Sequence, residues 1–495
     1  MSMSITLDAP LSRQDAAAVA GGAELRLSEA AWQRLARGRA IVEAIVDRGM
    51  LAYGVNTGVG ALCNVVVDRP HQRRLSRSIV MSHAVGVGAP LGAAETRAIM
   101  AAAVNNYAHG RSGVRPALVE QLLALLAEDC IPEVPSLGSV GYLSHMAHIA
   151  LVLIGEGTAL HRGERLPGGE ALARIGRAPL VLEAKEGLSL VNGSPCVTGL
   201  SALALSRAER LAGWADNIAA MSFEVLRGQP VAFDEASLAL RVSPGMQASG
   251  RRLRALLADS AILAAATGRQ TQDPLSLRAV PHVHGAVRDA LDMIGTTVER
   301  ELASVTDNPA VMGTPEAPEV YSEAHAVAPA IGLAMDQLGI AVAELAAMAE
   351  RRIDRLVNPL VSGLPPFLAA DSGVASGFMI AQYTAVSLAA RNRRLASPAS
   401  LDGGITSALQ EDHLTHATPA ALKALDILDN AEHILAIELL AATQAYDLLE
   451  GGLARAAGTD LLYRDVRAAL PPYRDDRPLA GDIAVARGIL QRDPG

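Results

Sequence analysis

The chain has 495 residues, of which half are apolar and 3% aromatic, and its formal net charge is −9 at pH 7. The acidic balance argues against a nucleic-acid partner. Much of the apolar share is Ala and Leu, which are strong helix formers, so the composition argues against a β-rich protein and predicts a mainly α fold.

Targeting and membrane signals are weak. The three cysteines are far apart, in no spacing typical of metal ligands, and suit a reducing compartment. The N-terminal residues show no basic region followed by an apolar core. The longest apolar stretch, 326–343, contains Pro329 and Asp336 and is interpreted as a buried helix. We therefore expect a cytoplasmic protein with no membrane partner.

The first part of the chain, residues 1–197, is predicted to be a loop-rich helical domain. Gly-, Pro- and Asn-rich stretches at 53–60, 82–92 and 130–141 alternate with short helical segments at 94–108 and 117–127.

From residue 198 onward the pattern changes to long helices. Helices are predicted over 200–226, 247–267, 284–302, 328–356, 376–395 and 418–448, with apolar residues at three- and four-residue spacing. We expect a central long-helix bundle over 198–450 and a C-terminal tail over 451–495, with one short helix after Pro471. Ala-rich helices that are apolar on several sides need burial on several sides, which favours additional subunit contacts.

Several short motifs occur in a fixed order between about residue 50 and residue 415. They are Tyr53–Gly58, Ser82–Gly86, Gly138–Gly141, Lys185–Leu188 with Asn192-Gly193, Gln272–Arg278, Thr306–Pro309, Ser362–Pro365, Ser376–Gln382 and Gln410–His413. This series resembles the histidine and aromatic amino-acid ammonia-lyases. The resemblance implies the mainly α fold of that superfamily, a homotetramer with a bundle of long helices, and active sites shared between subunits.

Tyr53 is a candidate general base for the removal of a β-proton. It lies in a glycine-flanked loop, where the backbone can approach a ligand closely, and a phenol of lowered pKa can act as a base. By resemblance this Tyr is the base. The alternative is a buried Tyr that makes one structural hydrogen bond.

Arg278 and Asn192 are candidates for holding the amino-acid part of a substrate. A guanidinium binds a carboxylate through two parallel hydrogen bonds, and the resemblance gives Arg278 this role. A structural ion pair with Asp273 is the alternative. Asn192 supplies both a donor and an acceptor near the α-carbon.

Glu411 is placed by the resemblance against the side chain of the substrate, and its carboxylate suits the N–H donors of an imidazole. The ligand is therefore expected to be a histidine-like small molecule. His83 is a candidate for the same ring-binding role, or for structural packing. His282 is a further substrate-binding candidate. The pair His282 and His284 has the spacing of two metal ligands on a strand, but no third ligand completes a site, so no metal is expected.

One loop departs from the family pattern. In the family, Gly-Ser-Val-Gly is followed by Ala-Ser-Gly-Asp, and the Ala-Ser-Gly cyclises to an electrophilic methylidene-imidazolone. Here Gly141 is followed directly by Tyr142, which stands in the place of the Asp. Leu275 and Ala324 replace two family aromatics, so all three are candidates for shaping the substrate site.

Without an electrophile, an ammonium is a poor leaving group, because the β-proton is weakly acidic. A trimethylammonium leaves as neutral trimethylamine, and its fixed charge acidifies nearby protons. Ergothionase, a relative without the electrophile, carries out this reaction. The main hypothesis is therefore a carbon–nitrogen lyase without a cofactor that converts ergothioneine to thiourocanate and trimethylamine.

Two alternatives remain open. The chain is a histidine ammonia-lyase dependent on the methylidene-imidazolone, with the cyclised tripeptide omitted from the written sequence, or it is an inactive paralogue with a structural or binding role. The sequence leaves open the ring substituent, the leaving amine and the direction of the reaction.

Overall fold

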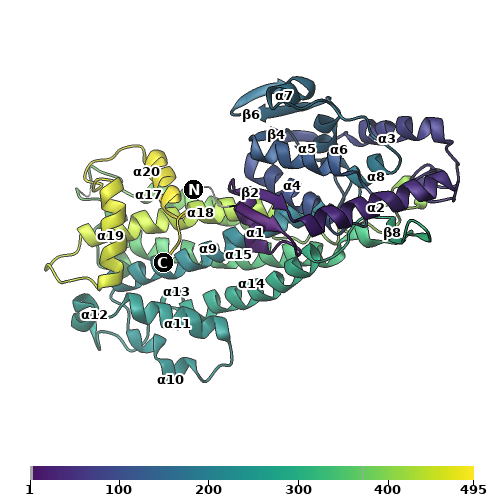
Figure 1. The fold of residues 1–495 in the computed structure, drawn as a ribbon. Helices are drawn as coiled ribbons and strands as arrows, with labels where there is room; N and C mark the ends of the chain where they lie inside the picture. The colour runs from purple at the N-terminus through teal and green to yellow at the C-terminus, as the bar shows by residue number, and fades with distance from the viewer. Residues whose placement is uncertain (1–3, 372) are drawn as a thin grey trace. The chain divides into compact units, whose positions relative to one another are not determined.

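The computed structural model describes residues 4–371 and 373–495, and helices make up most of it (Figure 1). By their contacts the residues form two units. The first comprises the chain up to Ser206 together with Gly295–Asp336 and Pro398–Leu422, and the second comprises Arg207–Ile294, Gln337–Ser397 and Lys423–Gly495. Four of the five boundaries between the units fall within the long helices α9, Pro195–Val225, α14, Val280–Leu302, α15, Pro329–Val357, and α18, Ala417–Asp447, and the fifth follows α17, Met379–Leu395.

The first unit consists of short helices with small sheets. Its helices are α1 Arg13–Ala20, α2 Glu29–Asp47, α3 Arg69–His83, α4 Ala93–Ala108, α5 Pro116–Ala127, α6 Ser144–Leu153, α7 Gly168–Arg174 and α8 Glu186–Val191, with 3-10 turns η1 Gly60–Leu62, η3 His325–Val327 and η5 Ser407–Leu409. Helix α4 is buried along almost its whole length, and its Ala-rich sequence lets α1, α2 and α5 pack closely against it.

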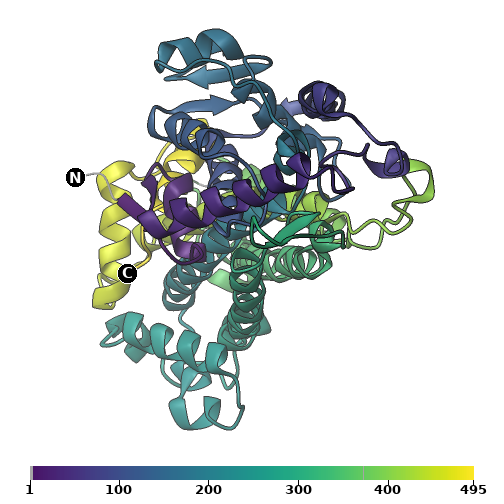
Figure 2. The same ribbon diagram turned by 45° about the vertical axis from the view of Figure 1, so that its right-hand side comes forward.

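Four small sheets complete the first unit. The strands β1 Ser4–Leu7 and β2 Glu24–Leu27 are parallel, with Ile5 opposite Leu25, while β3 Val87–Pro90 pairs antiparallel with β5 Pro135–Leu137. The strands β4 Cys130–Pro132, β6 Thr158–His161 and β7 Glu164–Pro167 form an antiparallel sheet, and β8 Ala310–Gly313 and β9 Pro318–Tyr321 form a hairpin. The three-stranded sheet lies beside α7, at the top of the view in Figures 1 and 2.

The second unit is built on long helices. Besides parts of α9, α14, α15 and α18, it contains α10 Glu235–Leu238, α11 Pro244–Leu256, α12 Ala261–Ala266, α13 Leu275–Arg278, α16 Pro359–Ser362, α17 Met379–Leu395, α19 Ala457–Ala469 and α20 Leu479–Ile489, with 3-10 turns η2 Pro230–Phe233 and η4 Pro366–Leu368. Arg352 of α15 donates to both oxygens of Glu438 of α18, at 2.6 and 3.0 Å, and Glu438 also accepts from Ser222 of α9 at 2.7 Å. Charged groups thus join three helices inside this unit.

The predicted mainly α fold is confirmed, and the long helices begin and end close to the predicted positions. One helix prediction is wrong. The expected single helix over 247–267 is two, α11 and α12, because Asp259 adopts a left-handed φ of 59° and Ser260 caps a new helix through the amide of Leu263. The short helix expected after Pro471 is α20. The three-part division at residues 197 and 450 stays a prediction.

Two helical stretches are long and apolar enough to cross a membrane by composition alone, Glu186–Val225 and His325–Val357. Their most apolar windows are 94% and 61% buried inside the protein. Burial of this extent is typical of core helices, in agreement with the interpretation of residues 326–343 as a buried helix.

Candidate active site

A cavity of about 660 Å³ in the first unit brings together residues from six separate parts of the chain. Six of the nine predicted site residues line it: Tyr53, His83, Tyr142, Asn192, Ala324 and Glu411. Since these side chains are scattered over some 360 positions of sequence, the fold assembles them. We refer to this cavity as the tyrosine pocket.

Tyr53 lies in a loop whose conformation is stabilised by polar side chains of the loop itself. Asn56 accepts from the amide of Ala52 at 2.9 Å, and Thr57 accepts from the amide of Gly54 at 3.0 Å. The Tyr53 hydroxyl accepts a hydrogen bond from the amide of Gly60 at 3.2 Å. Burial raises the pKa of Tyr53, the bond from Gly60 opposes this, and the charge of Glu411 raises the pKa further. The phenol is therefore protonated at neutral pH.

Glu411 is fixed in the pocket through its side chain and its backbone. Thr406 donates its hydroxyl to Oε2 of Glu411 at 3.0 Å, and the backbones of the two residues form an isolated β-bridge. Tyr142 lines the same pocket, and burial together with the Glu411 charge raises the pKa of Tyr142. The oriented carboxylate of Glu411 therefore lines the pocket as an acceptor for N–H groups.

Asn192 and His83 end two helices at the pocket. Asn192 follows α8, and its Nδ2 donates to the carbonyl oxygen of Asn308 at 2.5 Å. His83 is the last residue of α3, and its Nδ1 lies 2.8 Å from the carbonyl oxygen of Ile79. A carbonyl only accepts, so Nδ1 carries the proton and Nε2 of a neutral ring is left as an acceptor.

The loop that departs from the family pattern is strained where it enters α6. Gly141 has a φ of 144°, and Leu143 has φ 80° and ψ −78°, a conformation that residues with a Cβ rarely adopt. The carbonyl of Val140 accepts from the amide of His416 at 2.9 Å, and that of Gly141 from the hydroxyl of Thr418 at 2.9 Å. The loop is thus bound to residues 416–418 immediately before the departure.

The methylidene-imidazolone of the family is formed from an Ala-Ser-Gly tripeptide. Between Gly138 and Ser144 the written chain has no such tripeptide, and its one serine there, Ser139, is engaged with the amide of Gly141 and the carbonyl of Tyr142. The residues between Gly138 and Ser144 therefore cannot form the group by themselves.

The other three predicted site residues belong to the second unit. Leu275 and Arg278 are the first and last residues of α13, and His282 lies near the start of α14. Asp273, the expected partner in the structural alternative for Arg278, instead accepts hydrogen bonds from the amide of Gln229 at 2.5 Å and from Gln270. Burial and the charge of Arg241 lower the pKa of His282.

His284 has a structural role in the second unit. Its ring is fully buried, with Nδ1 2.7 Å from Oδ1 of Asp216, which also accepts from Ser249 at 2.6 Å. Burial lowers the pKa of His284. The alternating His282 and His284 therefore have different surroundings and do not act as a pair.

Several residues of the tyrosine pocket were not predicted as site residues. The carbonyl of Asn308 accepts from the side-chain amide of Asn192, and the hydroxyl of Thr406 donates to Glu411. Cys63 and Gln410 also line the pocket. Asn308 and Gln410 lie inside recognised motifs, so a signal was present. Thr406 and Cys63 lie outside them and gave none.

Comparison with known proteins shows the family. The model of the family described as "Aromatic amino acid lyase" matches residues 11–468. The chain is 44% identical over 487 residues to a histidine ammonia-lyase of Anaeromyxobacter sp. (strain K), covering 96% of this chain and 95% of the relative, and 43% identical over 483 residues to one of Symbiobacterium thermophilum, covering 97% and 95%.

Solved structures agree with this. The histidine ammonia-lyase from Trypanosoma cruzi matches with a TM-score of 0.91 and 34% identity, covering 99% of this chain and 93% of that one. The ergothionase from Treponema denticola matches with a TM-score of 0.90 but 27% identity, covering 99% and 98%. The chain belongs to the aromatic amino acid lyase family. It is an enzyme, a carbon–nitrogen lyase.

These comparisons correct two predictions. The main hypothesis, elimination of trimethylamine from ergothioneine, is wrong, because relatives with 40–44% identity over nearly the whole chain are histidine ammonia-lyases. The expectation that no cofactor is needed is wrong with it, since the resemblance described above ties that activity to the methylidene-imidazolone. The same relatives speak against an inactive structural subunit.

Proposed function

We propose that the protein is a histidine ammonia-lyase, which eliminates ammonia from L-histidine to give urocanate. The observation that carries this proposal is the 40–44% identity to histidine ammonia-lyases over at least 94% of the chain. A histidine-like substrate also suits the tyrosine pocket, where an oriented carboxylate stands opposite a candidate base.

The imidazole of the substrate binds Glu411 and His83 in this proposal. An imidazole N–H donates to the carboxylate that Thr406 holds in place, and the hydrogen bond to a charged acceptor is a strong one. When the ring of the substrate is protonated, its second N–H donates to Nε2 of His83.

Tyr53 takes the β-proton. The Glu411 charge raises the pKa of Tyr53, so an N–H donor that satisfies Glu411 weakens this effect and favours the phenolate. Binding of the ring thereby activates the base. Asn192 orients the amino group, and Arg278 of a neighbouring copy, in the proposed shared active site, clamps the carboxylate.

Tyr142, Leu275 and Ala324 are proposed to shape the substrate site, together with His282. Tyr142 and Ala324 line the tyrosine pocket. Leu275 and Ala324 are smaller than the family aromatics that they replace, and Tyr142 stands in the place of the family Asp. These three differences are proposed to alter the contacts of the substrate's ring and amine.

The proposed cofactor is the methylidene-imidazolone, from a cyclised Ala-Ser-Gly between Gly141 and Tyr142 that the written sequence omits. When present, the group supplies the electrophile that makes the amine leave.

The assembly is proposed to be a cytoplasmic homotetramer with shared active sites. Large apolar side chains on α15 and α17 stay exposed in the single chain, among them Ile340, Ile380 and Tyr383. Association of copies would bury this surface.

The test measures the products of turnover and the intact mass of the protein. Purified protein is incubated with L-histidine or ergothioneine, and urocanate, ammonia and trimethylamine are measured. We expect urocanate and ammonia from L-histidine only, and an intact mass above that of the 495 written residues by Ala-Ser-Gly less the water lost on cyclisation. No urocanate from a folded protein would refute the activity, and a mass equal to the written chain would refute the proposed cofactor.

A further inference from the structure

Two motifs have no part in the chemistry described above, yet they meet inside the first unit. Lys185, from the Lys-Glu-Gly-Leu motif, donates its Nζ to Oδ2 of Asp307, from the Thr-Asp-Asn-Pro motif, at 3.1 Å. The same ammonium donates to Oγ of Ser189 at 2.8 Å. Both charged side chains are fully buried. The pair joins segments 122 positions apart in the chain.

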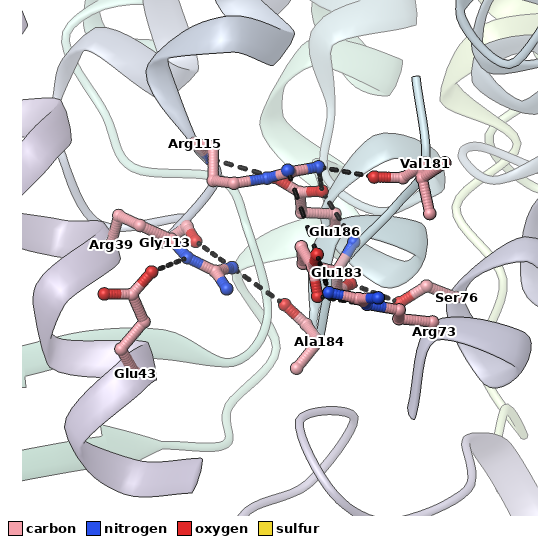
Figure 3. A network of polar contacts seen from close by, with 10 residues as sticks. All are labelled: Arg39, Glu43, Arg73, Ser76, Gly113, Arg115, Val181, Glu183, Ala184 and Glu186. Atoms are coloured by element: carbon pink, nitrogen blue, oxygen red, sulfur yellow. Dashed lines mark hydrogen bonds and ion pairs between the residues drawn. The ribbon is translucent and has the colours of Figure 1, made fainter. Parts of the chain in front are cut away.

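The backbone before α8 is held on its other side by an outer network (Figure 3). Arg73 pairs with Glu183 at 2.8 Å, and Arg115 pairs with Glu186 at 2.7 Å. Arg39 donates to the carbonyl of Ala184 at 3.1 Å. Residues 183, 184 and 186 thus face arginines, whereas Lys185 reaches into the interior.

The conformation of Lys185 makes this division possible. Its φ of 69° lies in the left-handed region, which is unfavourable for a residue with a Cβ. Such a conformation persists where the surroundings fix it from several sides. The arginine network and Asp307 provide that fixation.

The ion pair closes a short ring of contacts that includes the tyrosine pocket. Helix α8 begins directly after Lys185 and ends at Asn192, and Asn308 follows Asp307 in sequence. The ring is completed by the bond of 2.5 Å from Nδ2 of Asn192 to the carbonyl of Asn308. Both asparagines line the pocket. A change at one side of the ring therefore shifts the other.

Stability alone does not account for the pair. Removing two charges from water is costly, and apolar side chains of similar size often stabilise a core equally well. Oδ1 of Asp307 is buried without a hydrogen-bond partner in the described part of the chain, so the carboxylate is only half satisfied. Burial also lowers the pKa of Lys185, which Asp307 opposes. Apolar side chains would not supply the directional hydrogen bond between Lys185 and Asp307.

We propose that Lys185 and Asp307 are a positioning pair that fixes Asn192 and Asn308 in the tyrosine pocket. The kinetic part of this proposal rests on the proposed histidine ammonia-lyase activity. The structural part, that the pair orders α8 and the segment around Asn308, stands independently of the substrate.

The test uses the full-length double variant Lys185→Met with Asp307→Leu, which removes both charges and keeps side chains of similar size. A matched control is Arg352→Met with Glu438→Leu, which removes the equally buried pair of the second unit. Amide hydrogen exchange is measured over residues 186–195 and 304–310, together with kcat and KM for L-histidine. Where the double variant does not fold, Asp307→Asn serves in its place.

We expect faster exchange in both segments of the Lys185 and Asp307 variant and unchanged exchange there in the control. We also expect a fall in kcat on the order of 100-fold, as for a misplaced reacting group, at a folded fraction equal to wild type. Wild-type exchange in both segments would overturn the proposal, and so would faster exchange with unchanged kcat. If the wild type releases no urocanate, the proposed function fails, and the exchange measurement still decides whether the pair orders the pocket.

Discussion

Tyr142 and Glu411 line the same pocket, where burial and then the charge of Glu411 raise the pKa of Tyr142. The charge of the same carboxylate raises the pKa of Tyr53. Glu411 therefore suppresses the ionisation of two tyrosines. A ligand that donates a hydrogen bond to Glu411 weakens the effect of this charge and so favours ionisation of Tyr53.

Glu411→Gln is expected to weaken binding of L-histidine and to shift the pH profile. The loss of a hydrogen bond to a charged acceptor predicts an increase of KM of roughly 10- to 100-fold. Removing the negative charge also lowers the pKa of Tyr53. A base acts when deprotonated, so the acid limb of kcat/KM moves to lower pH. An unshifted acid limb would show that Glu411 does not affect the ionisation of Tyr53.

Tyr53→Phe is expected to abolish most turnover without unfolding the protein. General base catalysis contributes about 10²- to 10⁴-fold, and the hydroxyl makes one hydrogen bond, with the amide of Gly60. The measurement is kcat for L-histidine, with the midpoint of thermal unfolding as the control for folding. Unchanged turnover would remove Tyr53 from the mechanism.

The sequence predicted the fold because the helical signal is long and repetitive. Ala- and Leu-rich runs at three- and four-residue spacing specify α15 and α18 within one or two residues. The break between α11 and α12 depends on the single left-handed residue Asp259, and periodicity carries no signal for one torsion angle.

The sequence predicted residues that line the tyrosine pocket but not their contacts, and the roles of these residues stay predictions. The motifs located Tyr53, Asn192 and Glu411, which the fold brings to one pocket. They did not predict that Thr406 would orient Glu411, since this bond depends on a local β-bridge. The substrate predicted from the missing tripeptide was wrong, because a difference of three residues in one loop is outweighed by 44% identity over 487 residues to a histidine ammonia-lyase.

Arg352→Met is expected to destabilise the protein more than the double variant Arg352→Met with Glu438→Leu. The single change leaves the carboxylate of Glu438 buried without its charge partner, at a cost of about 3–5 kcal/mol. Replacing both residues removes the uncompensated charge. Urea unfolding at neutral pH measures both free energies, and equal losses would show that the pair contributes through packing alone.

His284 predicts how stability depends on mild acid. Burial lowers the pKa of its ring below the ordinary 6.5, so below about that pH the unfolded chain takes up a proton that the folded chain resists, and stability falls. For Asp216 burial works against ionisation, but the hydrogen bond from His284 and the charge of Arg288 lower its pKa to about 2. The stability contributed by this carboxylate is lost only between about pH 4 and pH 2. Between pH 7 and pH 5, therefore, the lowered pKa of His284 makes stability fall, whereas Asp216 stays ionised in the folded chain.

His284→Gln separates this contribution from those of other groups. The Gln amide can still donate to Asp216 but does not titrate. The free energy of unfolding in urea is measured at pH 7 and pH 5 for both proteins. We expect the variant to be less stable at pH 7 and to lose less stability than wild type on acidification. An equal loss in both proteins would mean that the buried ring of His284 takes up its proton as readily as in the unfolded chain.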